Sequence, residues 1–239
     1  MKLSIIMPVY NEARYFEKIL GKVRKVRLPL KKEIIIVESN STDGTREIVK
    51  KYENIKDIKI IYQEKALGKG NAIMQGLKKA TGDIILIQDA DLEYDPRDYN
   101  KLIAPILKKE VKFVIGSRKM GHKTWQIRSM KTNKYVVLFV NVIANLADEI
   151  FNLLYDVHLT DPQSMYKVFH KDCLKGVKFK SNRFDWDWEI CARFIRKGII
   201  PIEFPIAYNS RDFSEGKKIN IAREIFLNAT AIIKYRFLW

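Results

Sequence analysis

The chain has 239 residues, of which 47% are hydrophobic and 30% are charged. This length allows one large domain or two small ones, and the composition is typical of a soluble globular protein. The formal net charge of +16 is the unusual quantity. It predicts anionic partners, namely nucleic acid, a phospholipid surface or phosphorylated substrates.

Cysteine usage and apolar stretches bear on the cellular location. Cys173 and Cys191 lie far apart in the sequence and indicate neither a disulfide framework nor a cysteine zinc site. With an N-terminus that enters a strand at once, they favour a reducing cytosol. The best candidate for a membrane span, 135–147, is shorter than the roughly 20 apolar residues that cross a bilayer. We therefore expect a cytoplasmic protein that does not cross a membrane.

Short apolar runs alternate with helical patterns through the first 118 residues. This rhythm predicts an α/β fold with a parallel, doubly wound sheet. The predicted strands are 3–9, 33–37, 58–62, 84–87 and 111–116, and the predicted helices are 13–26, one beginning near 45, 68–82 and 98–109.

The strand predicted at 84–87 is followed by carboxylates at alternate positions. These are Asp89, Asp91 and Glu93, and Pro96 can then open a helix. Hard oxygen ligands at the carboxyl edge of a sheet are what a divalent cation holding a diphosphate needs. The alternative is a strand that ends in solvated acids.

Three further loops are predicted to meet these acids at the same edge of the sheet, where ligands of open α/β sheets bind. Tyr10 could stack on a base, Glu12 or Glu38 could accept hydrogen bonds from base or ribose, and Lys69 could contact a phosphate. The glycines at 68 and 70 lack the spacing of a phosphate-binding P-loop. Ordinary turn and cap chemistry is the alternative interpretation of these loops.

The second half changes character but follows without a linker, which predicts a single domain, 1–239. Two amphipathic helices are expected in this half. We expect the first to pack on the core, and the second, which is basic and ends in aromatic residues, to dock on a bilayer surface. The predicted elements are helices at 132–155, 184–198 and 219–239, a strand at 165–169 and an extended segment at 200–208.

The ordered set of motifs at 8–12, 41–45 and 89–91 resembles the donor half of the family-2 glycosyltransferases. The resemblance implies a GT-A fold and a nucleotide-sugar donor. Further motifs extend it to the branch that transfers sugars to dolichyl or polyprenyl phosphate, and they lie at 116–118, 160–162, 208–211 and 216–218. By this resemblance, 1–118 is the nucleotide-sugar-binding half and 119–239 the acceptor-binding half.

The resemblance also implies roles for single positions. Asp89, Asp91 and Glu93 match the acidic motif that holds Mg²⁺ or Mn²⁺, and Asp91 is also a candidate catalytic residue. The matches to nucleotide contacts are Pro8, Tyr10, Glu12 and Glu38, and the matches to basic residues that handle phosphates are Arg118, Arg128, Arg211 and Lys218. Glu93 stands where Gln is usual, and Glu38 with Ser39 replaces a common pair of aspartates, so both GDP- and UDP-sugars stay open.

Residues 185–189 form a second acidic cluster that contains two tryptophans. Asp187 could serve as a general base in an enzyme that activates a hydroxyl. The alternative is a helix start with acids near its positive end and two buried aromatic side chains.

The sequence predicts a metal-dependent, inverting glycosyltransferase with a lipid-phosphate acceptor at the cytoplasmic face of a membrane. Transfer to a sugar hydroxyl, with Asp187 as the base, is the alternative within the same class. A basic nucleic-acid-binding protein is the alternative from another class. No nucleic-acid partner is expected, because the chain has no recognisable base-reading module.

Overall fold

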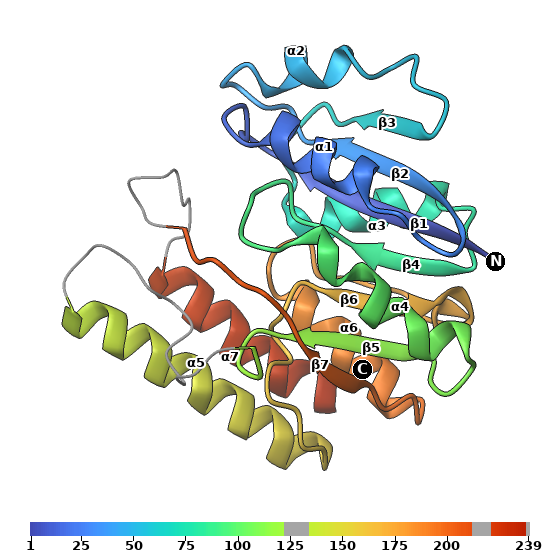
Figure 1. Cartoon of the computed structure of the whole chain (residues 1–239). Coiled ribbons are helices and arrows are strands. Elements are labelled where there is room, and N and C mark those ends of the chain that lie inside the picture. Colours follow the sequence, from blue (N-terminus) through green and yellow to red (C-terminus); the bar gives the residue numbers. More distant parts are fainter. Residues whose placement is uncertain (122–133, 212–220, 238–239) are drawn as a thin grey trace.

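A seven-stranded sheet in the order β3-β2-β1-β4-β6-β5-β7 lies at the centre of the computed structural model, which describes residues 1–121, 134–211 and 221–237 (Figure 1). The strands are β1 (Lys2–Val9), β2 (Lys31–Glu38), β3 (Ile58–Tyr62), β4 (Ile84–Ile87), β5 (Phe113–Ser117), β6 (Lys167–His170) and β7 (Ile202–Pro205). The predicted α/β class and mainly parallel sheet are confirmed. Only β6 runs antiparallel to its neighbours.

Helices cover both faces of the sheet, with α1 and α4 on one face and α3 and α6 on the other (Figure 1). The helices are α1 (Phe16–Lys25), α2 (Thr45–Lys50), α3 (Lys69–Lys79), α4 (Tyr99–Leu107), α5 (Lys134–Tyr155), α6 (Trp186–Arg196) and α7 (Ile221–Phe237). Two short 3₁₀ helices lie at Pro96–Asp98 and Lys171–Leu174.

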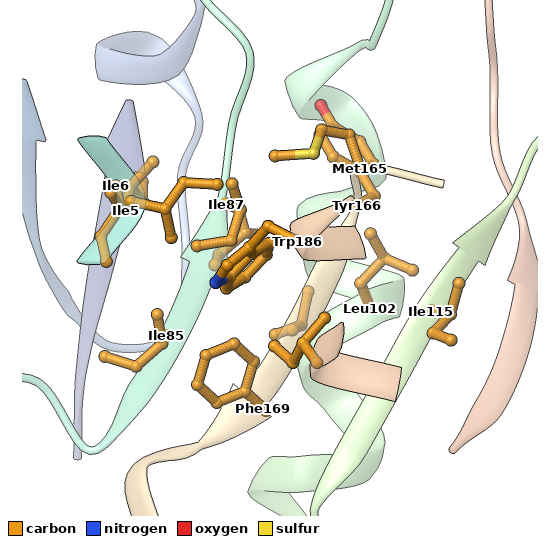
Figure 2. Packing of buried hydrophobic residues seen from close by; sticks show 14 of the residues in the cluster. Ile5, Ile6, Ile85, Ile87, Leu102, Ile115, Met165, Tyr166, Phe169 and Trp186 are labelled. Carbon is orange, nitrogen blue, oxygen red and sulfur yellow. The ribbon is translucent and has the colours of Figure 1, made fainter. Parts of the chain in front are cut away.

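Because helices cover both faces, the central strands read as continuous apolar runs. All four residues of β4 are buried, and so is most of β1. Figure 2 shows Trp186 of α6 among the aliphatic side chains of β4, with Phe169 of β6 beside them. This core fixes the carboxyl ends of β1, β2 and β4 at one edge, where the predicted ligand-binding loops begin.

Strand β6 comes from the second half of the chain but lies between two strands of the first half. It pairs with β4 through Leu86 and Val168, and with β5 through Val114 and Val168. The sequence predicts a strand here but not its place in the sheet. The two halves therefore share one sheet.

The expectation that the first amphipathic helix packs on the core is only partly met. Helix α5 buries Asn141, Asp148 and Phe151, yet Phe139 is 55% exposed and Leu153 is 83% exposed. By length and composition α5 could cross a membrane, with a mean hydropathy of 1.6 over a window that is 22% buried. The sequence-based limit of 135–147 was therefore too short, because the apolar pattern continues to Tyr155.

The second amphipathic helix, α7, contacts both α5 and α6. Its Ala231, Ile232 and Tyr235 are buried, whereas Ile233 and Phe237 are exposed. Residues 238–239, which end the predicted docking helix, lie outside the described part of the chain. Within residues 227–237, α7 has both a packing face and an exposed apolar side.

Candidate active site

A cavity of about 410 Å³ opens at the carboxyl edge of the sheet. Four of the five residues predicted to contact the nucleotide or its phosphates line it, as do all three predicted metal ligands and one predicted phosphate-binding arginine. The lining residues are Pro8, Val9, Tyr10, Glu12, Ser39, Ala66, Gly68, Lys69, Ala72, Asp89, Ala90, Asp91, Glu93, Arg183, Phe184 and Arg211.

The loop after β1 is held in shape by the loop after β2. Asn11 has a left-handed backbone (φ 54°), which asparagine tolerates better than most residues. Its N–H donates to Ser41 Oγ (2.9 Å), and its Oδ1 accepts from the N–H of Thr42 (2.7 Å). The N–H of Glu12 donates to Thr45 Oγ1 (2.8 Å). The motif at 41–45 therefore positions Tyr10 and Glu12 at the cavity.

Glu38, a predicted nucleotide contact, is not among the residues that line the cavity. Its fully buried carboxylate accepts from Arg46 Nε (2.5 Å) and from the N–H of Ser41 (2.7 Å). Ser39, the next residue, lines the cavity instead and donates its hydroxyl to Gln63 Oε1 (2.7 Å). Glu38 supports the loop that carries the site, and a direct role in nucleotide binding stays a prediction.

Basic side chains contact both aspartates that follow β4. Lys69 Nζ lies 2.6 Å from Asp89 Oδ1, and Arg211 NH2 lies 2.7 Å from Asp91 Oδ2. Asp91 Oδ1 accepts from the N–H of Glu93 (3.0 Å). Burial, followed by the charges of Asp89 and Glu93, raises the pKa of Asp91, although Arg211 acts in the opposite direction. The negative charge of these closely spaced carboxylates favours the binding of a cation between them.

The acidic motif fits a divalent cation by its chemistry, since its carboxylates are hard oxygen ligands at the carboxyl edge of the sheet. In the described residues, no three His, Cys, Asp or Glu side chains converge as a ready-made metal cage. Asp89 and Asp91 instead face Lys69 and Arg211. Ligation by Asp89, Asp91 and Glu93 stays a prediction.

Lys69 is placed by a close approach between the chain before α3 and the chain before α6. A Cβ on Gly68 would lie 2.3 Å from the carbonyl oxygen of Asn182, and one on Gly70 would lie 2.4 Å from that of Ser181. Only glycine fits at both positions. Burial alone would lower the pKa of Lys69, but the charges of Asp89 and Asp187 raise it overall. Lys69 is therefore a charged group at the cavity wall.

Glu93 fastens the segment after β7 to the end of β4. Its Oε2 accepts from Tyr208 Oη (2.9 Å), and its Oε1 accepts from the N–H of Arg211 (2.8 Å). Its carbonyl oxygen accepts from the N–H of Asn209 (2.9 Å). These contacts explain how Arg211, which follows β7, reaches the acids that follow β4.

Arg118 is buried rather than exposed to the cavity. Asp161 accepts from its Nε and its NH2, both at 2.7 Å, and from its backbone N–H at 2.9 Å. The motif at 160–162 thus holds the loop that follows β5. Contact between Arg118 and a phosphate stays a prediction, while Arg128 and Lys218 lie outside the described residues.

The acidic cluster at the start of α6 makes contacts within the protein, and a catalytic role for Asp187 stays a prediction. Trp186 and Trp188 are buried, and Glu189 accepts from the backbone N–H of Ser181 (2.7 Å). Asp187 Oδ1 lies 3.1 Å from the buried Lys167 Nζ, and Asp187 is not among the cavity-lining residues. Burial raises the pKa of Asp187, and Lys167 opposes that rise.

Ser39, Arg183 and Phe184 line the cavity without having been predicted as contacts. Phe184 is 38% exposed, and Lys69 Nζ lies 5.3 Å from the centre of its ring. In the sequence, residues 183–184 were marked only by their position directly before the acidic cluster. Their place at the cavity depends on the long-range contact of this segment with Gly68 and Gly70, which the sequence does not show.

The matches to known proteins agree with this site. The profile of glycosyl transferase family 2 matches residues 4–177. The chain belongs to glycosyl transferase family 2. The match includes the loops after β1, β2, β3 and β4, and it confirms the prediction of a glycosyltransferase.

Two sequence relatives are named as transferases to dolichyl phosphate. Dolichol-phosphate mannosyltransferase of Pyrococcus furiosus is 27% identical over 221 residues, which make up 91% of this chain and 60% of that protein. UDP-N-acetylglucosamine–dolichyl-phosphate N-acetylglucosaminyltransferase of Methanococcus voltae is 28% identical over 245 residues, which make up 94% of this chain and 93% of that protein. This family-2 chain thus spans less than two thirds of the first relative.

A solved structure shares the fold. Glucosyl-3-phosphoglycerate synthase of Mycobacterium tuberculosis, in complex with Mn²⁺, UDP and glucosyl-3-phosphoglycerate, superposes with a TM-score of 0.68 at 18% identity. The match covers 97% of this chain and 79% of that one. The predicted GT-A fold is confirmed.

Proposed function

We propose that the protein transfers a sugar, with inversion, from a nucleoside-diphosphate sugar to a polyprenyl or dolichyl phosphate. The observation that carries the proposal is the meeting of Asp89 and Asp91 of the donor half with Arg211 of the acceptor half in one cavity. The names of the two dolichyl-phosphate relatives support this acceptor class.

The nucleotide is proposed to lie along the loops after β1, β2 and β3. Tyr10 is 44% exposed at the cavity and offers an aromatic face to a base. Ser39 and the Gly68–Lys69 turn complete this wall. A thermal-shift assay of GDP- and UDP-sugars with Mn²⁺ identifies the donor, because a bound ligand raises apparent stability by mass action.

Asp89 and Asp91, with Glu93, are proposed to hold a Mg²⁺ or Mn²⁺ ion, in line with the Mn²⁺ in the complex of the solved structure. The ion would supply Lewis-acid stabilisation of the leaving diphosphate. Lys69, which is charged and borders the same cavity, would neutralise part of the diphosphate. These groups stabilise charge that grows on the leaving oxygen.

A phosphate acceptor needs positioning more than it needs a base. A lipid phosphate is ionised near neutral pH, so its oxygen can attack the anomeric carbon while the bond from that carbon to the diphosphate breaks. The nucleoside diphosphate leaves on the opposite face. Arg211 can hold two phosphate oxygens at once through its planar guanidinium. It therefore suits the alignment of two anions.

Transfer to a sugar hydroxyl remains the second candidate, because Asp187 lies close enough for its charge to raise the pKa of Lys69 at the cavity. A hydroxyl acceptor benefits from a positioned base by roughly 10²–10⁴-fold. The carboxylate of Asp187 is engaged by Lys167, however, and lies outside the cavity lining. The phosphate acceptor is the better supported of the two.

Single-turnover transfer from the best donor to a short polyprenyl phosphate separates these candidates. We expect Asp187→Asn to keep the chemical rate within about tenfold, because no proton must be removed from an ionised phosphate. Arg211→Ala should lower transfer by about 10²-fold or more through loss of phosphate positioning. Collapse of the Asp187→Asn rate, with folding and donor binding preserved, would favour the hydroxyl acceptor.

A peripheral membrane location is proposed through α5 rather than through the C-terminal helix alone. Seven exposed apolar side chains of α5, most of them three or four residues apart, form one stripe along the helix, which we call the α5 stripe. It comprises Tyr135, Leu138, Phe139, Val142, Leu146, Ile150 and Leu153. A bilayer surface suits this stripe, because the net charge of +16 favours anionic lipid and the proposed acceptor is itself a lipid.

A further inference from the structure

Arg211 is held inside the acidic part of the cavity by several oxygens. NH1 lies 2.9 Å from Glu12 Oε2, while NH2 lies 3.1 Å from Glu12 Oε1 and 2.7 Å from Asp91 Oδ2. Its side chain is 13% exposed. The guanidinium thus joins the loop after β1 to the loop after β4, although it comes from the segment after β7.

The guanidinium of Arg211 contacts Asp91, which is one of the proposed ligands of the divalent cation. Asp91 has two carboxylate oxygens, and both are occupied: Oδ1 by the N–H of Glu93 and Oδ2 by Arg211. The Glu93 contact is a short-range turn within one loop. The Arg211 contact depends on a flexible side chain. A divalent ion held by Asp91 would therefore compete most directly with Arg211.

The bound position of Arg211 also leaves one of its donors unsatisfied. Nε is buried and forms no hydrogen bond within the described residues, and Glu93 Oε1 lies 3.8 Å from it. A buried donor without a partner costs about 1–3 kcal/mol. The guanidinium cannot leave by losing its proton, because arginine remains charged in proteins. It can leave only by turning toward another anion.

We propose that Arg211 is an exchangeable internal counter-ion: it neutralises Asp91 and Glu12 before a divalent cation binds, and the cation displaces it from Asp91 toward a phosphate. This deepens the function proposed above by coupling ion binding in the donor half to anion binding by the acceptor half. The main chain need not move far. Tyr208 and Asn209 stay fastened to Glu93 while the side chain turns.

Mn²⁺ binding to the metal-free protein, without nucleotide or acceptor, tests the exchange directly. Electron paramagnetic resonance titration measures free Mn²⁺ and needs no catalytic turnover. Arg211→Gln should tighten Mn²⁺ binding about tenfold or more, because a competing positive charge is removed from Asp91. Arg24→Gln is the matched control, since it removes one positive charge from an exposed position on α1 that is not part of the cavity lining, and it should change affinity by less than about threefold.

Pyrophosphate binding at saturating Mn²⁺ tests the second half of the exchange. Arg211→Gln should weaken pyrophosphate binding by about tenfold, because the displaced guanidinium no longer meets the anion. Tighter Mn²⁺ binding together with weaker pyrophosphate binding supports the proposal. Unchanged or weaker Mn²⁺ binding overturns it, and so does tighter Mn²⁺ binding with unchanged pyrophosphate binding. Far-ultraviolet circular dichroism of each variant verifies the fold, and failure of sugar transfer alone leaves these measurements intact.

Discussion

Buried or partly buried acids are paired with basic side chains at both the carboxyl edge and the amino edge of the sheet. At the carboxyl edge, Lys69 and Arg211 neutralise acids that also form the proposed donor site. At the amino edge, Glu33 is 3% exposed and accepts from Ser4 Oγ (2.6 Å), and Lys2 and Lys59 lie within 2.7 and 2.9 Å of it. The first set lines the cavity of the proposed donor site, and the second set lies outside that lining.

Glu33 gives a pH-dependent prediction for stability. Burial would raise the pKa of its carboxyl, but hydrogen bonds from Lys2, Ser4, Thr81 and Lys59 lower it well below its ordinary value. The ionised form therefore stabilises the fold above about pH 4.5, and this contribution declines as pH falls further. We expect Glu33→Gln to lower the free energy of unfolding at pH 7 by about 2–3 kcal/mol. Urea unfolding at pH 7, 5 and 3 measures this change.

The gap between wild type and Glu33→Gln should shrink from pH 5 to pH 3, because the wild-type carboxylate then loses its advantage. A gap that stays constant over this range would contradict the prediction. Lys59→Met is a suitable comparison, since it removes a partially exposed partner and leaves Lys2 in place. It should cost less than the Glu33 change.

The sequence predicted which residues lie at the site more readily than it predicted which side chains those residues contact. The sequence placed Tyr10, Lys69 and Asp91 at one sheet edge, because a strand-end position follows from local pattern. It could not reveal that Glu38 binds Arg46 or that Arg118 binds Asp161. A charged side chain has the same sequence signature whether it binds a ligand or a buried counter-ion. Only long-range geometry separates the two.

At the scale of elements, strands were predicted more accurately than helix environments. The strand Ile58–Tyr62 matches its predicted bounds, since β-branched residues and flanking turns define it locally. Helix α5 was assigned to the core because an apolar face ordinarily packs inward. Part of α5 packs against α7, and the α5 stripe remains exposed. Helical periodicity shows that a face is apolar without showing what covers it.

The α5 stripe gives a prediction for membrane binding. Phe139→Ser with Leu146→Ser should weaken binding to anionic phospholipid vesicles by about tenfold or more, because each buried side chain of this size contributes roughly 1.5–3 kcal/mol. Sedimentation at low salt measures the bound fraction, and added salt should reduce it. Ile200→Ser is the control, since Ile200 is 51% exposed and lies outside α5.

Equal vesicle binding by the wild type and the double variant would contradict docking through α5. Removing residues 237–239 tests the C-terminal helix separately, because Phe237 is 66% exposed at its end. Loss of binding only in this truncation would assign docking to the C-terminal helix, as the sequence first suggested. Asp148 lies on the packed side of α5 and pairs with Lys119 Nζ at 2.6 Å, which anchors the helix to the segment directly after β5.

At the scale of the whole molecule, strand order connects the two halves more tightly than chain order does. The proposed boundary between the nucleotide-binding and acceptor halves lies near residue 118, after β5. Strand β6 nevertheless lies between β4 and β5, and Arg211 reaches back to Asp91. The alternating pattern of the first 118 residues could not show that its sheet is completed by a strand some 50 residues later in the chain.

This arrangement predicts that the chain unfolds as one unit. A fragment of residues 1–118 should fail to fold, because β4 and β5 would lack the strand that pairs with both of them.

In the full chain, urea transitions followed by far-ultraviolet circular dichroism and by tryptophan fluorescence should share one midpoint. Trp186 and Trp188 lie in the second half, whereas most of the sheet belongs to the first. Mn²⁺ with a nucleoside diphosphate should move both midpoints together, since the donor cavity includes Arg211 from the second half. Two separate midpoints, or a folded 1–118 fragment, would show instead that the donor half is an independent domain.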